Sequence, residues 1–157
     1  RLGASGRIIT AFDMARVMAL GADWCNAARG FMFALGCLQA QTCHTGACPT
    51  GVATQDPQRQ QSLVVPDKAE RVFNFHQQTL HALKEMVQAI GVEHPQDITA
   101  HHIVRRTADR KVKSLAQLIL TQLPAGALLK DDLSSLSIIY RQSWPLASAN
   151  SFKLQNQ

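Results

Sequence analysis

The sequence lacks any long run of uncharged apolar residues. Its most hydrophobic stretch, residues 2–40, is interrupted by charged side chains that include Asp13, Arg16, Asp23 and Arg29. A membrane-spanning helix needs about 20 consecutive, predominantly apolar residues, so this composition excludes one. With 46% apolar and 17% charged residues over 157 positions, the composition is that of a globular protein with one modest core.

The sequence also lacks an initiator methionine and a signal peptide. It begins at Arg1, and the first residues have no basic, apolar and small-residue order. Ser5-Gly6-Arg7 is typical of a turn, and the next element follows at once. We therefore expect a piece of a longer, cytoplasmic protein, and membrane attachment through residues outside this piece stays open.

Aromatic residues are scarce where basic residues gather. The chain has 16 Lys and Arg against 11 Asp and Glu, a net charge of +5, and many of its cations fall between His101 and Lys113. No aromatic side chain in that stretch could stack on a base. The pattern argues against nucleic acid as a partner and favours a solvated helix face or a protein-docking surface.

The first 38 residues alternate between strand and helix patterns. Apolar stretches around Ile8-Ile9 and Trp24-Cys25 flank a helical segment over residues 11–20, whose opening Thr10-x-x-Asp13 fits a capping box. A second helix is predicted from near Ala28 through Leu35. This order of elements predicts an α/β fold with a parallel sheet.

Beyond residue 38 the pattern changes. Residues 39–65 show no periodicity, and an amphipathic helix then follows Pro66-Asp67 and ends before Gly91. Shorter helices are predicted over residues 100–106, 114–121 and 136–142. The predicted regions are 1–65, a helical extension over 66–147 and a frayed tail over 148–157.

Three of the four cysteines, Cys37, Cys43 and Cys48, lie within 12 residues in the predicted loop. Disulfides are disfavoured, because three clustered cysteines leave one unpaired unless Cys25 joins them. Zinc with His44 as fourth ligand is a better alternative, although neither gap is as short as in zinc knuckles. A three-iron cluster suits the wider spacing. Three buried structural thiols are improbable in a polar loop, whereas that interpretation suits Cys25.

Two strand-to-helix turns are candidate phosphate sites. In a β/α barrel the loops after the last two strands commonly bind a cofactor phosphate at a helix N-terminus. Ser5 and Gly6 form one such turn, and Ala28 and Arg29 lie at the second. Each is also consistent with a plain tight turn, and Arg29 could instead pair with Asp13 or Asp23.

With these residues in view, the sequence resembles the end of the FMN-binding domain of glutamate synthases, most closely the smaller relatives without a glutaminase. The resemblance is carried by GRIITAFDMARVMALGADWCNAARGFMFALGCLQAQTCHTGACPTGVATQDP and continues through VVPDKAERVFNFH, HHIVRR and WPLASANSF. The most specific feature is the cysteine spacing followed by CPTGVATQ.

The resemblance implies the last strand-helix units of a (β/α)8 TIM barrel, followed by the cysteine loop and a mostly helical extension. It implies a 3Fe-4S cluster on Cys37, Cys43 and Cys48, and FMN with its phosphate near Ser5, Gly6, Ala28 and Arg29. Electrons from ferredoxin or another donor would pass through the cluster to FMN. FMN would then reduce the imine of 2-oxoglutarate and ammonia, with free ammonia or glutamine as nitrogen source, to L-glutamate.

Three hypotheses follow. The first is a glutamate synthase-like oxidoreductase fragment, inactive alone because the rest of the barrel is missing. The second is a non-catalytic zinc-binding interaction module, and metal identity separates it from the first. The third is a remnant reading frame that is never assembled into an enzyme.

Overall fold

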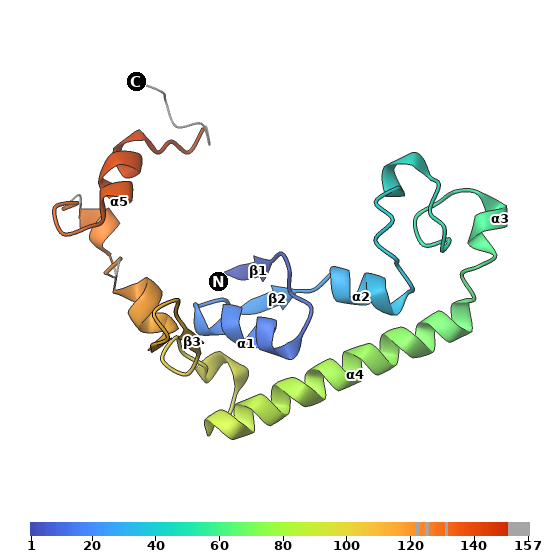
Figure 1. Cartoon of the computed structure of the whole chain (residues 1–157), viewed down its shortest axis with the longest axis horizontal. Coiled ribbons are helices and arrows are strands. Elements are labelled where there is room, and N and C mark those ends of the chain that lie inside the picture. Colours follow the sequence, from blue (N-terminus) through green and yellow to red (C-terminus); the bar gives the residue numbers. More distant parts are fainter. Residues whose placement is uncertain (122, 125, 131, 151–157) are drawn as a thin grey trace. The chain divides into compact units, whose positions relative to one another are not determined.

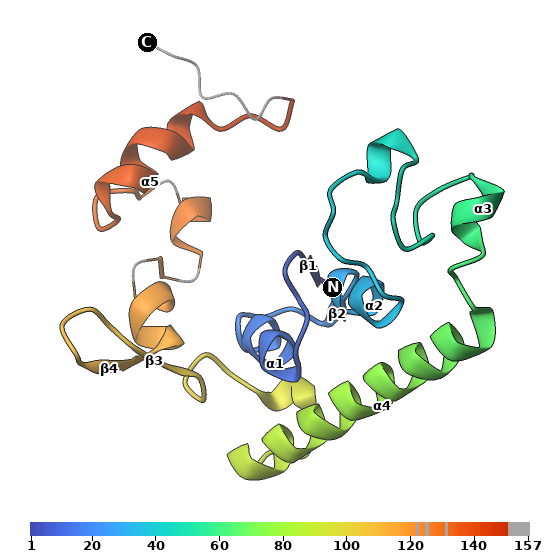
Figure 2. The same cartoon turned by 45° about the vertical axis from the view of Figure 1, so that its right-hand side comes forward.

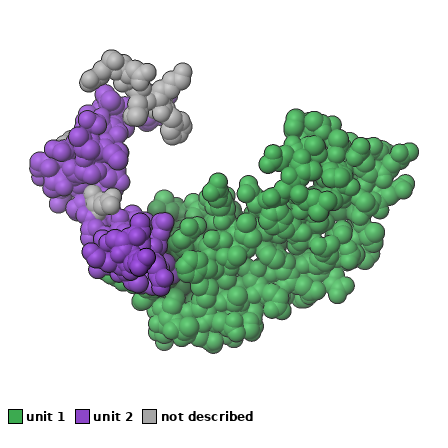
Figure 3. Space-filling model, in the orientation of Figure 1, with its two compact units in different colours: residues 1–102 green, residues 103–157 purple. Residues whose placement is uncertain are grey.

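The computed structural model describes residues 1–121, 123–124, 126–130 and 132–150. The chain forms two compact units, residues 1–102 and 103–157, which Figure 3 shows in different colours. Unit 1 contains the cysteine loop and both candidate phosphate turns. Among the described residues, no helix has the length and apolar character needed to cross a membrane.

Unit 1 opens with two strand-helix repeats. They are β1 (Gly3–Ser5), α1 (Ala11–Ala19), β2 (Trp24–Asn26) and α2 (Arg29–Ala34). The strands pair in parallel, which confirms the expected α/β arrangement. Within the described residues each of the two sheets has two strands, and neither is a closed barrel.

The first strand lies earlier than the sequence predicts. The prediction of a strand around Ile8-Ile9 is wrong, because β1 has already ended at Ser5. Ile8 is only 2% exposed. Ile8 is therefore apolar because it is buried after the strand has ended. An apolar pair alone does not distinguish a buried loop residue from a strand residue.

Helix α1 begins as the capping box predicts. Thr10 is the N-cap, its hydroxyl accepts the Asp13 N–H, and the Asp13 carboxylate accepts the N–H groups of Thr10 and Ile9. These donors lower the pKa of Asp13, with backbone N–H of Thr10 as the largest cause. Ala11, Ala15 and Ala19 form the buried face of α1.

The long helix α4 (Val65–Ile90) supports both α1 and α2, and both views show these two helices along α4 (Figure 1, Figure 2). It ends before Gly91, as predicted from the sequence, and Gly91 has a left-handed φ of +83°. Leu83 and Val87 are buried. Phe73 and Leu80, expected on the same buried face, are 60% and 43% exposed, so the apolar stripe is wider than the contact it makes here.

Helices α2 and α4 approach closely. The rings of Phe31 and Phe75 meet edge to face with centroids 5.2 Å apart. A Cβ on Gly30 would lie 2.6 Å from a ring carbon of Phe75, so glycine permits this approach.

The cysteine loop, residues 36–64, is less irregular than predicted. It contains a short 3-10 turn, η1 (Cys43–Thr45), and a four-residue helix, α3 (Pro57–Gln60). Asp56 caps α3 and Pro57 occupies its first turn, which is a recognised start signal. After α4, a second 3-10 turn, η2 (Pro95–Asp97), contacts α1.

Unit 2 begins with an antiparallel hairpin of β3 (Val104–Arg106) and β4 (Val112–Ser114). The helix predicted over residues 100–106 is therefore wrong, because the turn that reverses the chain at Thr107–Lys111 was not recognised. The hairpin leads into a π-helical segment, η3 (Ala116–Leu120), then η4 (Ala127–Lys130), α5 (Ile138–Ser143) and η5 (Trp144–Leu146). Of the predicted tail, residues 151–157 lie outside the described residues.

Candidate functional site

The two candidate phosphate turns lie next to each other. In the parallel pair, Ser5 is the register partner of Asn26, so both turns leave the same end of the sheet. Gly6 and Arg7 follow β1 with φ values of +96° and +54°. Successive backbone N–H groups near such left-handed residues commonly form concave anion sites.

Helix α2 follows the second turn. Its N-cap, Ala28, provides no side-chain hydrogen bond to the first turn. The N–H groups there are consequently not satisfied by a capping side chain, and Arg29 adds a cation at the first helical position. The turn carries the chemistry that an anionic group requires.

A cavity of about 480 Å³ joins this turn to the cysteine loop. Ala28 and Arg29, predicted to bind a phosphate, line this cavity together with Cys37 and Cys43, predicted to bind a metal. The other lining residues are Met32, Phe33, Gln39 and Gln41. Cys48, Ser5 and Gly6 are not among the lining residues.

The backbone of the cysteine loop is unusual. Five of its residues have positive φ: Gly36, Gln39, Gln41, Gly46 and Gly51. For the two glutamines this conformation is uncommon, since a side chain in the left-handed region costs about 1–2 kcal/mol. Such backbone curvature recurs where N–H groups surround phosphates or iron-sulfur clusters.

The three cysteines of the loop differ in environment. Cys48 is buried and its Sγ lies 3.5 Å from the Thr50 hydroxyl. Hydrogen bonds from that hydroxyl and from the N–H groups of Ala53 and Thr50 lower the pKa of Cys48 to about 7. Cys37 accepts the N–H of Gln39 at 3.5 Å, and Cys43 is exposed.

All four cysteines are free thiols, so the structure contains no disulfide among them. In the described part of the chain, no three His, Cys, Asp or Glu side chains are arranged to hold a metal ion. Cys25 is half-buried in β2, and burial raises the pKa of its thiol, which agrees with a structural thiol.

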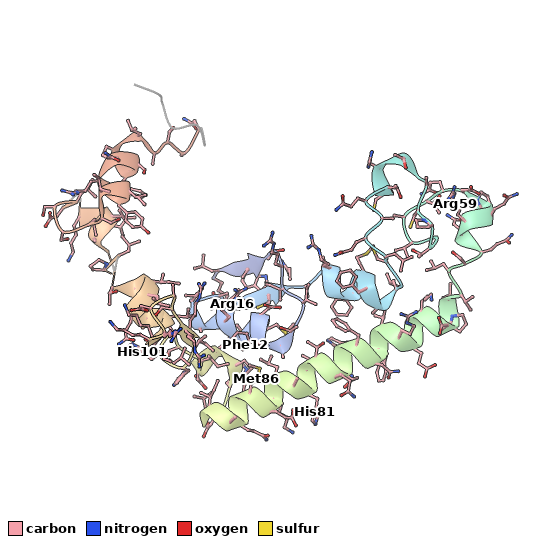
Figure 4. All side chains as sticks on the ribbon, in the orientation of Figure 1. Phe12, Arg16, Arg59, His81, Met86 and His101 are labelled. Atoms are coloured by element: carbon pink, nitrogen blue, oxygen red, sulfur yellow. The ribbon has the colours of Figure 1, made fainter. Side chains whose placement is uncertain are left out.

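Polar side chains tie the loop together. Thr54 Oγ1 donates to the Gly46 carbonyl, and Arg59 Nη1 donates to the Ala47 carbonyl at 3.4 Å. Figure 4 labels Arg59 near the start of the long helix. Arg59 also pairs with Asp56 at 3.4 Å. Sequence reasoning missed Thr50, Thr54 and Arg59. For Arg59, the Asp-Pro start of α3 was the available signal.

Arg29 does not form the alternative ion pairs considered for it. Asp13 pairs instead with Arg16 at 3.6 Å, and Asp23 accepts the Leu2 N–H at 2.6 Å. Within residues 1–121 and the other described segments, no carboxylate lies within 4.0 Å of the Arg29 guanidinium. Its charge remains available at the cavity.

Comparison with known proteins adds an independent finding. A family model described as a conserved region in glutamate synthase matches residues 1–93. The chain is 40% identical over 119 residues to a glutamate synthase large subunit-like protein of Bacillus subtilis. These aligned residues are 76% of this chain and 23% of that protein.

Two further relatives show how far the similarity extends. An archaeal glutamate synthase (NADPH) of Methanocaldococcus jannaschii is 38% identical over 89 residues, 57% of this chain and 18% of its own length. Glutamate synthase (NADH) of Saccharomyces cerevisiae is 29% identical over 96 residues, 61% of this chain and 4% of its own. The chain spans less than a quarter of the length of these relatives.

Proposed function

This chain belongs to the glutamate synthase family, and from that premise we propose that it is the part of a glutamate synthase-like oxidoreductase where a metal cluster meets a flavin phosphate. One observation carries the proposal: two residues of a candidate phosphate turn and two clustered cysteines line one cavity. A site for one cofactor would need either cysteine ligands for a metal or a turn for a phosphate, but not both in one cavity.

In this proposal Cys37, Cys43 and Cys48 are the ligands of a 3Fe-4S cluster. The donor set fits, because thiolates are the usual ligands of iron-sulfur clusters and the Cys48 pKa of about 7 favours its thiolate. When bound, the cluster would accept and donate electrons one at a time. The N–H groups of this loop would stabilise the negative charge on the sulfur atoms.

The arrangement of the free thiols is compatible with this assignment. Bonds to a metal supply the free energy that gathers its ligands, so a loop without its metal need not hold them in place. Two of the three cysteines line the cavity and the third is buried nearby in sequence. Closing the ligand set requires rearrangement within one loop.

Ser5, Gly6, Ala28 and Arg29 are the proposed contacts to the FMN phosphate. The support is the shared sheet end of the two turns, the start of α2 without a capping side chain, and the Arg29 cation, which has no ion pair among the described residues. When bound, FMN would supply hydride transfer, which is chemistry of the cofactor. The role of this chain would be to bind and orient the phosphate.

The proposed reaction of the whole enzyme is formation of L-glutamate by reductive amination of 2-oxoglutarate, with ammonia or glutamine as the nitrogen source. Ferredoxin or another donor would supply the electrons; relatives are named for NADPH and NADH. The two paired strands would be completed to a (β/α)8 barrel by the rest of the parent chain, so this chain alone is expected to be inactive. Four free thiols suit a reducing compartment, and we propose the cytoplasm.

The test is metal analysis with electron paramagnetic resonance on the anaerobically purified full-length protein. We expect about three irons per chain, little zinc and a paramagnetic signal in the oxidised state. Cys43→Ser is expected to abolish that signal, whereas Cys25→Ser, the matched control in β2, should preserve it. Stoichiometric zinc without iron would refute the cluster and support a zinc-binding interaction module. A cluster signal unchanged in Cys43→Ser would refute the ligand assignment.

A further inference from the structure

The exposed hairpin of unit 2 carries almost all of the chain's net charge. We call residues 104–114 the basic hairpin; they contain one carboxylate, Asp109, and a net charge of +4 of the chain's +5. Its five cations are Arg105, Arg106, Arg110, Lys111 and Lys113. The strand residues are exposed except Ser114, which is half-buried. A charge this concentrated creates a local positive potential.

The strand register places two of these cations opposite each other. Arg105 pairs with Lys113 across the antiparallel ladder. Directly opposite side chains in such a pair have Cβ atoms about 4.5–5.5 Å apart, and like charges there are destabilising. The hairpin thus holds a repulsive pair that an anion between the two side chains would convert into an attractive one.

The hairpin's own carboxylate does not neutralise this pair. Asp109 pairs with Lys111 at 3.4 Å and accepts the hydroxyl of Thr107. Over the described residues, which omit 122, 125, 131 and 151–157, no carboxylate lies within 4.0 Å of Arg105, Arg106, Arg110 or Lys113. Four cations therefore face solvent without an ion pair there.

The turn adds one of these cations at a conformational cost. Arg110 has a φ of +62° and its N–H donates to the Thr107 carbonyl at 3.0 Å. Glycine or asparagine is the favourable residue at such a left-handed position. The base of the hairpin is anchored, because the flanking Ile103 and Leu115 are buried and joined by a 2.8 Å hydrogen bond.

We propose that the basic hairpin is a docking surface for an acidic protein, whose carboxylates bridge Arg105 and Lys113. A protein fits better than a nucleic acid, because residues 104–114 contain no aromatic side chain to stack on bases. Val104 and Val112, 59% and 61% exposed, lie on the opposite face of the ladder from Arg105 and Lys113, so the proposed contact rests on charge. The inference does not depend on the cluster or the flavin.

The test measures binding of a fluorescent polyglutamate peptide to the full-length protein at low salt. Arg105→Glu is expected to weaken binding about tenfold or more, because it places a like charge against the probe. The same substitution introduces an attractive pair with Lys113, so the melting temperature should hold or rise. Peptide affinity would then fall while the melting temperature does not, whereas a misfolded variant would lose both.

Two controls make the outcome decisive. Arg71→Glu, an equal charge change on the exposed side of α4, is expected to leave binding nearly unchanged. Lys113→Gln should weaken binding less than Arg105→Glu and serves if that variant fails to fold. The proposal is overturned if the peptide does not bind, if Arg71→Glu weakens binding equally, or if an oligonucleotide or phosphatidylserine vesicles of matched charge bind more tightly.

Discussion

The strand-helix scaffold and the cysteine loop of unit 1 are stabilised by different forces. The scaffold packs apolar faces: alanines of α1 and the Leu83-Val87 side of α4 are buried, and α2 meets α4 through aromatic rings. In the loop, Cys48 is the one residue with a buried side chain, and short polar contacts connect the rest. Burial of apolar area is the larger stabilising term in proteins.

The difference indicates which region would depend more on the proposed cofactors. A scaffold with its own core keeps its geometry without a cofactor. A polar loop with five left-handed residues buries little apolar surface and is therefore less stable locally. Substitutions in the two regions should therefore separate, with loop changes altering metal content and scaffold changes altering global stability. The following four predictions concern the full-length protein.

The largest effect is expected for Gly51→Ala in the loop. Gly51 has a φ of +75°, and an added Cβ would overlap the carbonyl oxygen of Arg59. The left-handed backbone and the steric overlap together cost about 2–5 kcal/mol of local destabilisation. Iron per chain should fall sharply while the melting temperature changes little. Gly46→Ala, also left-handed but in open space, is the control and should lose less iron. Equal losses would rule out the steric explanation.

Gly30→Ala tests the scaffold. The added methyl group would meet the ring of Phe75 at 2.6 Å, and such overpacking costs about 1–3 kcal/mol. Urea unfolding should report that loss. Phe75→Leu makes room for the added methyl group. The double variant should therefore lose less free energy of unfolding than the two single variants lose together. Strict additivity would show that the two residues do not interact.

Asp13→Ala removes half of the α1 capping box and should cost about 1 kcal/mol at neutral pH. The pKa of Asp13 is lowered from 3.8, so the unfolded state binds the proton more tightly. The carboxylate's contribution is therefore complete well above pH 3.8 and is lost as pH falls through the lower folded-state pKa. The difference between variant and wild type should shrink in acid. Asp56→Ala, which uncaps the loop helix α3, should hardly alter global unfolding.

The smallest effect is expected for Arg59→Ala. Its pair with Asp56 is half exposed, and such ion pairs contribute about 0–1 kcal/mol. Global stability should stay constant. Faster hydrogen exchange at residues 46–60 would report the lost contact to Ala47, and unchanged exchange would show that the contact contributes nothing.

Sequence patterns predicted the scaffold well because local signals and packing agree there. Thr10-x-x-Asp13 and Gly91 marked helix ends that the structure reproduces. The error at Ile8-Ile9 arose because burial and strand pairing select the same side chains. The helix expected over residues 100–106 failed because strand pairing is decided by residues some ten positions away, across a turn that has Arg110 where glycine is usual.

The candidate site was predicted in composition and only partly in arrangement. Cys37, Cys43, Ala28 and Arg29 were each singled out, yet their common cavity depends on a chain path that no local pattern encodes. The left-handed glutamines and the contacts of Thr50 and Thr54 were not foreseeable either, because those residue types occur in most loops. Whether the thiols meet around a cluster remains a prediction.

The contact between α2 and α4 has a consequence for the proposed metal site. The chain enters the cysteine loop from α2 and leaves it into α4, and the meeting of Phe31 and Phe75 joins these two helices. Packing of α2 against α4 thus holds the two ends of the loop together. Much of the entropic cost of closing the loop is therefore met by folding and would not have to be met by metal binding. If Cys37, Cys43 and Cys48 are the proposed ligands, three thiols on such a ring would act as a multidentate chelator with a raised effective concentration. Loosening the contact between the two phenylalanines should therefore weaken the proposed metal binding by a loop to which neither ring belongs.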